Sequence, residues 1–277
     1  MSLTNKALFV IERNLNRELS LGEIAERLGV SRFHLAHAFG ESTGRSVMEY
    51  VRGRRLTEAA YALASGAEDI LAVALDGGYG SHEAFSRAFK AQFGRTPDEV
   101  RKNESIAGLV PVDAIRHLVS KPMKLTEPRI EKIGELLFVG LKEKVAYGEM
   151  QNIAGQWQRF MSGRYHEIEH RTPSIPVGIT AASDDAGIDY VCAAEVSRFG
   201  AVPKGLVKVT LAPQTYAVFA HDTHITRLRE TYDAIWNEWF PASGKTPADV
   251  PGFERHNETF DPRTGDGGVT IWIPLAA

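Results

Sequence analysis

The chain has 277 residues, of which 43% are hydrophobic and 24% are charged. These are the proportions of globular proteins and the length suits two domains, so wholesale disorder is excluded. The net charge is −3, and residues 1–110 hold 14 basic and 14 acidic side chains. A strongly basic block is therefore excluded, and any DNA-binding surface must gather its positive charge on one face.

The sequence carries no sign of export. Cys192 is the single cysteine, so no disulfide can form within the chain. The longest early apolar run, Ala7 to Ile11, is too short for the core of a signal peptide, and no stretch approaches the length of a membrane span. We therefore expect a soluble, cytoplasmic protein without a membrane partner.

The first 110 residues repeat themselves with a period near fifty. A serine, two large apolar residues and a glycine recur in two copies, as Ser31, Leu35, Phe39 and Gly44 and then as Ser81, Phe85, Phe89 and Gly94. Each copy indicates a short helix, a turn that contains glycine, and a second helix capped by the serine.

The apolar spacing predicts where the helices of this region lie. The short helices fall near residues 21–28 and 70–75, and the second helices run from Ser31 to Gly44 and from Ser81 to Gly94. A longer helix over residues 47–64 joins the copies, and Gly94 and Pro97 end the last helix. Two helices joined by a tight turn form a helix-turn-helix, whose second helix enters the major groove of DNA.

The second copy and its tail closely resemble the AraC-type DNA-binding domain. The matching segments are Gly78-Tyr79-Gly80-Ser81, Phe85-Ser86-Arg87-Ala88-Phe89-Lys90, Phe93-Gly94-Arg95-Thr96-Pro97 and Arg101. The resemblance covers roughly residues 4–103. It implies an all-α domain over residues 1–104 that binds double-stranded DNA through two helix-turn-helix motifs.

The second recognition helix has a polar face that fits DNA. Phe85, Ala88 and Phe89 face inward, so the opposite side and the amino end hold His82, Glu83, Ser86, Arg87 and Lys90. Arg87 is the candidate for a bidentate contact with guanine. The alternative is that Arg87 pairs with an acidic neighbour on a solvated face.

The first recognition helix departs from the AraC-type pattern. Its outward side carries Phe33, Ala36, His37 and Gly40, with Arg32 near the amino end, where the family usually has longer polar or basic groups. Apolar groups can contact thymine methyl groups, and Arg32 or His37 could reach phosphates. Alternatively, the second helix carries most of the readout.

The helix that joins the two copies and the segment after the second copy are less informative. On the joining helix, Arg52, Arg54 and Arg55 face phosphates or solvent. We place a linker at residues 105–123, where Pro111 and Pro122 interrupt the chain. Its apolar residues could form a short helix packed between the domains: Ile106, Leu109, Val110, Ile115, Leu118 and Val119.

The remaining residues contain a second repeat, with an offset of about eighty. Matching positions include Val139 and Val218, Trp157 and Trp236, Phe160 and Trp239, and the segments 190–193 and 270–273. Each half indicates the order strand, strand, helix, strand, strand, with helices near 153–166 and 225–239. We expect an α+β domain whose two repeats pair their sheets around a cleft, a natural ligand site.

This half resembles the GyrI-like effector-binding domain, which occurs in multidrug-sensing regulators and gyrase-inhibitory proteins. The matching segments are Leu137 to Leu141, Tyr147, Trp157, Trp236 to Pro241, Phe253-Glu254 and Ile271 to Leu275. The resemblance covers about residues 124–277. His256 stands where the family usually has an aromatic residue.

A carboxylate among aromatic rings predicts a site for an amphipathic cation, because rings attract positive charge through their quadrupoles. The rings are those of Tyr147, Trp157, Tyr190, Trp236 and Trp239. Glu254 is the first candidate for the carboxylate and Glu195 the second. The alternatives are that the tryptophans belong to the core and that Glu254 is an exposed charge at a strand end.

Other chemistry is weakly indicated. His166 and His170 are four residues apart but have no evident third metal ligand, and no catalytic triad can be singled out, so we expect no metal, cofactor or catalytic residue.

The sequence therefore predicts a transcription regulator. A small, amphipathic or cationic effector in the C-terminal domain would change how the chain binds DNA or recruits RNA polymerase. The alternatives are that the C-terminal domain is a small-molecule hydrolase, with Glu254 activating water, or a protein-interaction module. The operator, the ligand, the sign of regulation and the oligomeric state are left open.

Overall fold

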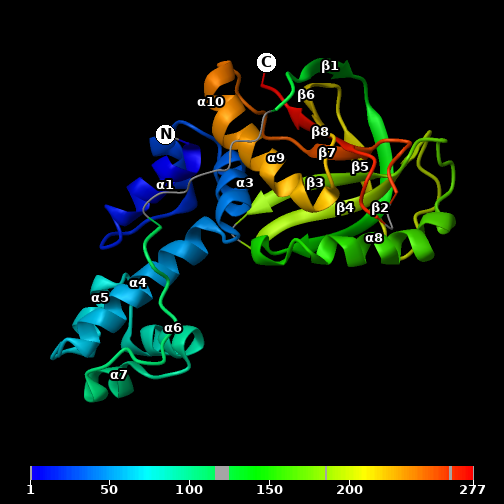
Figure 1. The fold of residues 1–277 in the computed structure, drawn as a ribbon. Helices are drawn as coiled ribbons and strands as arrows, with labels where there is room; N and C mark the ends of the chain where they lie inside the picture. The colour runs from blue at the N-terminus through cyan, green and yellow to red at the C-terminus, as the bar shows by residue number, and fades with distance from the viewer. Residues whose placement is uncertain (1, 116–124, 185, 262–263, 277) are drawn as a thin grey trace. The chain divides into compact units, whose positions relative to one another are not determined.

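The computed structural model describes residues 2–115, 125–184, 186–261 and 264–276 (Figure 1). By its internal contacts the chain divides into two units. Unit 1 comprises Leu3–Val30 and Val47–Leu118, and unit 2 comprises Ser31–Ser46 and Val119–Ala277. None of the described helices combines the length and the apolar character that a membrane span requires.

The described part of unit 1 is helical. Its helices are α1 (Leu3–Glu12), α2 (Leu21–Leu28), α4 (Val47–Ala64), α5 (Ile70–Asp76), α6 (His82–Phe93) and α7 (Pro97–Asn103). Ser20 and Ser81 cap α2 and α6 by accepting a hydrogen bond from the backbone N–H three residues further on, both at 3.1 Å. Gly29 and Gly94 end these helices with positive φ angles, as glycine allows.

Pro97 does not end α6 but begins α7. The α6 helix already stops at Gly94, and Thr96 then caps the next helix. The Thr96 hydroxyl accepts from the Glu99 N–H at 3.3 Å, while the Glu99 carboxylate accepts from the Thr96 N–H at 2.6 Å. Proline is favoured at the first helical position because its missing N–H would have no partner there.

One apolar cluster of unit 1 lies between α4 and the three helices that follow it. Phe85, Phe89 and Phe93 of α6 are buried against Leu56 and Leu63 of α4. The three phenylalanine rings contact each other in sequence, with centroids 5.5 and 4.8 Å apart. This core fixes which side of α6 faces outward.

Arg54 is not a phosphate-facing or solvated charge. Its side chain is only 7% exposed and its guanidinium donates to Glu12 at 3.0 Å and to Glu58 at 2.7 Å. The Tyr50 hydroxyl donates to the same Glu12 carboxylate at 2.7 Å. Arg54 is therefore part of the internal framework of unit 1, whereas Arg52 on the same helix is exposed.

The linker runs along α4 without forming a helix over its described residues 105–115. Thr57 accepts a hydrogen bond from the Val112 N–H at 2.9 Å, and Arg54 donates to the Val112 carbonyl at 3.1 Å. Ile106 and Leu109 pack on the core of unit 1. The predicted helix residues Leu118 and Val119, and also Pro122, lie outside the described residues.

Unit 2 is built on one antiparallel sheet. Its strands are β1 (Arg129–Ile133), β2 (Leu136–Val145), β3 (Val177–Asp184), β4 (Gly187–Val196), β5 (Val207–Leu211), β6 (Gln214–His221), β7 (Gly252–His256) and β8 (Val269–Pro274). They are ordered β1-β6-β8-β7-β3-β4-β2-β5. The predicted order of strand, strand, helix, strand, strand is confirmed in both halves, and so is the α+β fold.

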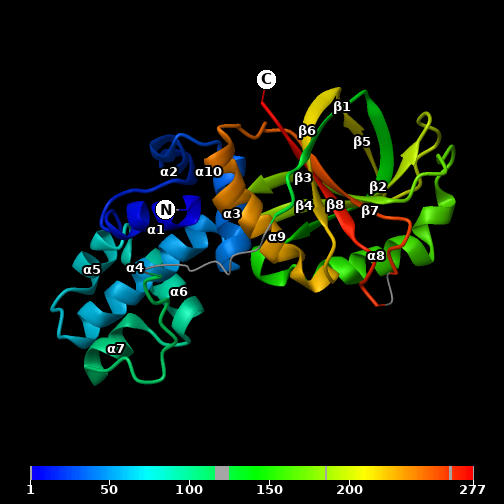
Figure 2. The same ribbon diagram turned by 45° about the horizontal axis from the view of Figure 1, so that its top comes forward.

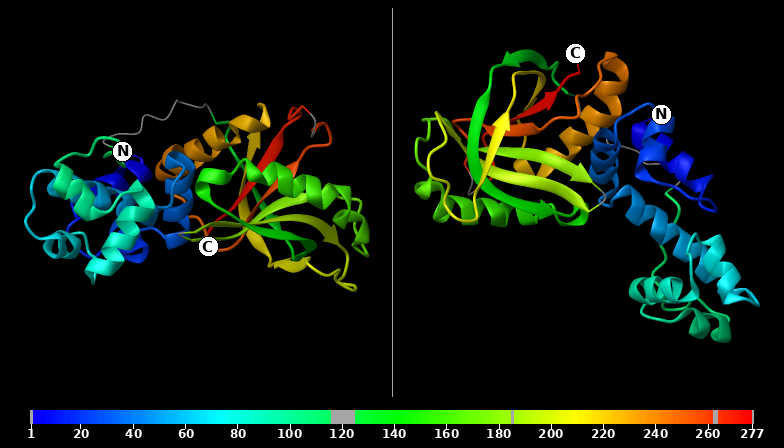
Figure 3. Two further views of the ribbon diagram at one scale, coloured as in Figure 1. Left: turned by 90° about the horizontal axis from the view of Figure 1, so that it is seen from below. Right: turned by 180° about the vertical axis from the view of Figure 1, so that it is seen from behind.

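The two repeats exchange their first strands. Strand β1 of the first repeat pairs with β6 of the second, and β5 of the second pairs with β2 of the first. Strands β3 and β7 join the halves at the centre, where Gly178 is the register partner of Glu254. Figure 3 shows from two further sides how strongly this sheet curls.

The helices after the second strand of each repeat cover one face of the sheet (Figure 2). They are α8 (Asn152–Ser162), followed by the short helix η2 (Arg164–Glu167), and α9 (Leu228–Ala234), preceded by η3 (Ile225–Arg227). The α9 helix continues as the π-helical turn η4 (Ile235–Trp239) and as α10 (Phe240–Ser243). The short helix η1 (Tyr147–Glu149) follows β2.

Unit 2 also contains α3 (Arg32–Thr43), the second helix of the first sequence repeat. Ser31 caps it by accepting from the His34 N–H at 3.1 Å, and Gly44 ends it, both as predicted. Its placement among the elements of unit 2 was not predicted.

The Arg54 network predicts a local effect on the stability of unit 1. Arg54→Ala leaves Glu12 without its cation and should lower the free energy of unfolding by about 3 kcal/mol, as breaking a buried pair does. Arg52→Ala should change it by less than about 0.5 kcal/mol. All four tryptophans lie in unit 2, so tryptophan fluorescence would not report the unfolding of unit 1. Hydrogen exchange of the α4 amides is therefore the suitable measurement. Equal effects of the two substitutions would contradict the structural role of Arg54.

Candidate functional site

The outward side of α6 is polar and accessible. His82, Glu83, Arg87 and Lys90 are exposed and Ser86 is half-buried. Among the described residues, Arg87 has no ion-pair partner, so the pairing with an acidic neighbour is not observed. The guanidinium therefore remains available to a nucleic-acid base or a phosphate.

The outward side of α3 is covered. Arg32 is exposed and Phe33 half-buried, but His37 is only 4% and Ala36 only 2% exposed. Elements of unit 2 cover this side: the His37 ring contacts Tyr232 and Trp236, with centroids 5.4 and 5.3 Å away. His37, which was predicted to face DNA, thus faces other elements of unit 2 instead.

The second site centres on Glu254, in the middle of the sheet. The Glu254 side chain is half-buried, and each of its carboxylate oxygens accepts one tyrosine hydroxyl: Tyr232 of α9 donates to Oε1 at 2.7 Å and Tyr190 of β4 donates to Oε2 at 2.9 Å. Burial raises the pKa of Glu254, and the two hydroxyl donors counteract this by stabilising the charged form. Glu254 is therefore not an exposed charge at a strand end.

Neighbouring residues make room for this arrangement and support it. A Cβ at Gly178 would collide with the Tyr190 hydroxyl, so the close approach of Tyr190 to Glu254 requires glycine there. The Trp157 indole N–H of α8 points to the Tyr190 hydroxyl at 3.4 Å. His256 packs on Trp157 at a centroid distance of 5.3 Å, and burial lowers the pKa of His256.

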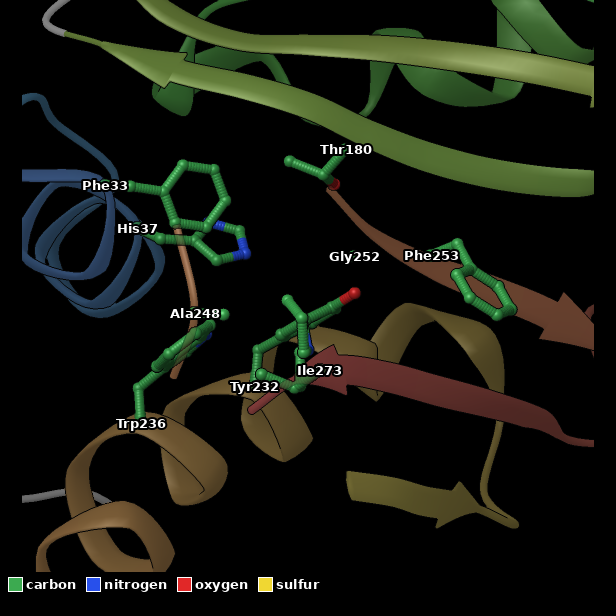
Figure 4. Close-up of a pocket in the computed structure, with 10 residues that line it drawn as sticks. Phe33, His37, Thr180, Tyr232, Trp236, Ala248, Gly252, Phe253 and Ile273 are labelled. Carbon is green, nitrogen blue, oxygen red and sulfur yellow. The ribbon is translucent and has the colours of Figure 1, made fainter. Parts of the chain in front are cut away.

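A pocket is lined by Tyr232, one of the two tyrosines that donate to Glu254 (Figure 4); Glu254 itself is not among its lining residues. Its walls come from β3 and β7 at the centre of the sheet, from α9 and η4, from the end of β8, and from α3. The lining residues are Phe33, His37, Thr180, Tyr232, Trp236, Ala248, Gly252, Phe253, Ile273 and Pro274. The free space that remains is about 10 Å³, room for about one water molecule.

The structure places Tyr190 on the Glu254 carboxylate, Trp157 on the Tyr190 hydroxyl and Trp236 in the wall of the pocket. Other residues predicted for this site lie elsewhere. Trp239 is half-buried and packs on Phe219 and Phe240, with ring centroids 4.9 Å away in both cases.

Glu195 and Tyr147 also lie apart from the carboxylate. Side chains alternate along β4, so Glu195 lies on the sheet face opposite Tyr190, where Ser174 donates to it at 3.1 Å and Arg255 lies 3.5 Å away. Tyr147 is buried beside α3, with its hydroxyl bonded to Ser183.

Sequence reasoning missed Tyr232. Its spacing of four from Trp236 places both on one side of a helix, and this signal was available in the sequence. The weak metal hypothesis also loses its basis, since η2 ends at Glu167 and His170 has a φ of 58°. Within the described ranges, no group of three metal-ligating side chains is found.

Comparisons with known proteins identify both regions. A helix-turn-helix domain family matches residues 24–103, and the GyrI-like small molecule binding domain family matches residues 126–276. The transcriptional regulator Rob of Salmonella typhimurium is 25% identical over 95% of this chain and 93% of its own length.

Two further matches cover one region each. The multiple antibiotic resistance protein MarA of Escherichia coli K12 is 40% identical over 33% of this chain and 72% of its own. The solved structure of SAV2435 bound to tetraphenylphosphonium is 21% identical, covers 55% of this chain and 95% of that one, and has a TM-score of 0.46. Together, the two family matches and the full-length relative show that the chain belongs to the AraC-type transcription regulators that carry a GyrI-like small-molecule-binding domain.

Proposed function

We propose that this regulator senses a flat, lipophilic cation in the pocket beside Glu254 and reads DNA chiefly through α6. The observation that carries the proposal is a half-buried carboxylate held by two tyrosine hydroxyls, one of which belongs to a residue that lines an aromatic pocket. A carboxylate taken out of water attracts a counter-charge, and aromatic faces favour a cation over an anion. The effector then changes DNA binding or the recruitment of RNA polymerase.

The rival functions of the C-terminal domain receive less support. Both Glu254 oxygens are engaged by hydroxyl donors, which stabilise the carboxylate and weaken it as a base for activating water. The aromatic lining favours a small apolar ligand over a protein segment. Recovery of the bound compound unchanged after long incubation is the expected result, whereas its turnover would favour a hydrolase.

The polar side of α6 supports a direct role in base recognition. Arg87 is exposed on the same side as Lys90 and follows the amino-terminal turn that holds His82 and Glu83. The amino-terminal half of a recognition helix is the part that reaches base edges. The exposed arginine, long enough for bidentate contact with guanine, is therefore the main reader.

Arg87→Ala should weaken binding to a selected duplex by about 1–3 kcal/mol and relax discrimination at one or two base pairs. His37→Ala should reduce specificity less, because the α3 face is not the main reader. Binding measured against a panel of single-base variants separates the two roles. An equal loss on all sequences would place Arg87 on a phosphate, and a larger loss of specificity for His37→Ala would reverse the assignment.

Glu254→Gln should weaken binding of a cation by about 2–5 kcal/mol, because the substitution removes a desolvated counter-charge and preserves side-chain size. N-methylquinolinium and neutral 2-methylquinoline are matched probes for calorimetry on the full chain, at a pH where the latter is unprotonated. The neutral probe should be little affected. Glu195→Gln, on the opposite face of the sheet, is the control.

The pH dependence gives the same test a second readout. Only the ionised carboxylate attracts the cation, and burial raises the pKa of Glu254. Cation affinity should therefore begin to fall, as the pH is lowered, above the range in which an ordinary carboxyl titrates. Unchanged binding of both probes by Glu254→Gln would remove the carboxylate from the site. A loss confined to Glu195→Gln would mean that the other glutamate is the counter-charge.

A further inference from the structure

The two recognition helices of this chain present opposite chemistry on their outward sides. On α6 this side carries Glu83, Arg87 and Lys90, all exposed. On α3 the same side carries Phe33, Ala36, His37 and Gly40, and elements of unit 2 cover it. A helix surface with apolar, small and uncharged groups is suited to packing on protein as well as to reading DNA.

The side chains of α3 fill the aromatic pocket. The His37 ring contacts both Tyr232 and Trp236, and the His34 ring lies 4.8 Å from Trp236 and 5.8 Å from Phe240. Figure 4 shows Phe33 and His37 reaching from α3 toward the Tyr232 hydroxyl. This tyrosine donates to Glu254, so α3 occupies the approach to the carboxylate.

The helix is held there by a close backbone approach and by polar contacts. A Cβ at Gly40 would stand 2.6 Å from Cγ of the Tyr147 ring, so only glycine allows this contact. Ser42 donates to Asp233 at 2.5 Å and accepts from the Asn237 amide at 2.8 Å. The Arg229 guanidinium donates to the Glu41 carbonyl near the carboxyl end of α3, where a cation is favourable.

The space left beside α3 decides what an effector must do. About 10 Å³ remains, which admits a water molecule but not an aromatic ring. We propose that α3 is a removable lid of the effector pocket, an inference that rests on the proposed effector function. Binding of the effector separates α3 from the pocket and frees this helix for DNA.

Closure of the lid leaves several buried polar atoms without hydrogen-bond partners. This cost weakens the closed state, so α3 can be displaced. Within the part of the chain that the structure describes, buried His34 Nε2, His37 Nδ1 and Trp236 Nε1 have no hydrogen-bond partner. Each such group costs free energy that an open state in water recovers. Closure also buries Glu41, and desolvation raises its pKa to about 7.

The lid sets the sign of regulation. A closed lid hides the outward side of α3 and excludes the effector, so effector and DNA both favour the open state. The effector therefore strengthens DNA binding, and DNA strengthens effector binding by the same factor.

A disulfide that locks the lid tests this proposal. In the Gly40→Cys, Tyr147→Cys double variant, the two Cβ atoms would lie within about 4 Å of each other, the span of a disulfide. Cys192, the only native cysteine, is buried, and it is present in the oxidised and the reduced samples alike. Two affinities of the full chain are measured in its oxidised and reduced forms. Calorimetry gives the affinity for N-methylquinolinium, and a duplex selected from a random library gives the affinity for DNA. The single-cysteine variants are the controls for oxidation.

Oxidation should lower both affinities at least tenfold, and reduction should restore them. A disulfide that forms without changing either affinity, or one that tightens binding of the probe, would overturn the lid, as would failure of the disulfide to form. Loss of DNA affinity on oxidation in a chain that never binds the probe would uphold the lid and refute the proposed cation site.

A second variant opens the lid from the other side without altering α3 or Glu254. The Arg229→Ala, Asp233→Ala double variant removes the polar contacts at the carboxyl end of α3. Its DNA affinity without effector should rise several-fold toward the value that wild type reaches with effector. Unchanged DNA affinity and unchanged hydrogen exchange over residues 32–43 would contradict the lid.

Discussion

The half-buried carboxylate of Glu254 is the constraint on which the organisation of unit 2 depends. It lies at the junction of the two repeats, where β3 meets β7, and it takes one hydroxyl from each side: Tyr190 from the first repeat and Tyr232 from the second. An uncompensated charge at this depth would be strongly unfavourable. The pairing of β3 with both β7 and β4, with its close approach at Gly178, brings the Tyr190 hydroxyl to the carboxylate, and α9 brings that of Tyr232.

The same constraint explains how a small molecule can act on a DNA-binding protein. The carboxylate lies beside an aromatic pocket, and the entrance to that pocket is covered by α3, whose outward side is apolar enough to serve as a substitute ligand. One helix surface is then shared by two competing partners, DNA and the pocket. A molecule that takes over the pocket removes one competitor, so coupling requires no long pathway between the sites.

The sequence predicted the elements whose determinants are local. Serine caps, glycine stops and apolar spacing placed α2, α4 and α6, and the eighty-residue offset predicted both halves of the sheet. Glu254 was singled out because the segment Phe253-Glu254 matches the GyrI-like domain and because the two repeats are rich in aromatic residues. The predictions that were wrong concern contacts between residues far apart in the sequence. The sequence cannot tell that Arg54 meets Glu12 forty-two residues away, or that Glu195 lies on the far face of the sheet. The unusual outward side of α3 was visible, but its partner was not, because that partner lies about two hundred residues further along the chain.

Effector and DNA favour the same state of the chain, so each should strengthen the binding of the other, and this linkage can be measured. The affinity of the full chain for its selected duplex is measured across a range of N-methylquinolinium concentrations, and the affinity for the probe is measured with and without duplex. The Glu254→Gln variant reports any direct effect of the probe on DNA. We expect the probe to tighten DNA binding and DNA to tighten probe binding by an equal factor, with no effect in the variant. Weaker DNA binding in the presence of bound probe, or no change at saturation, would contradict this linkage.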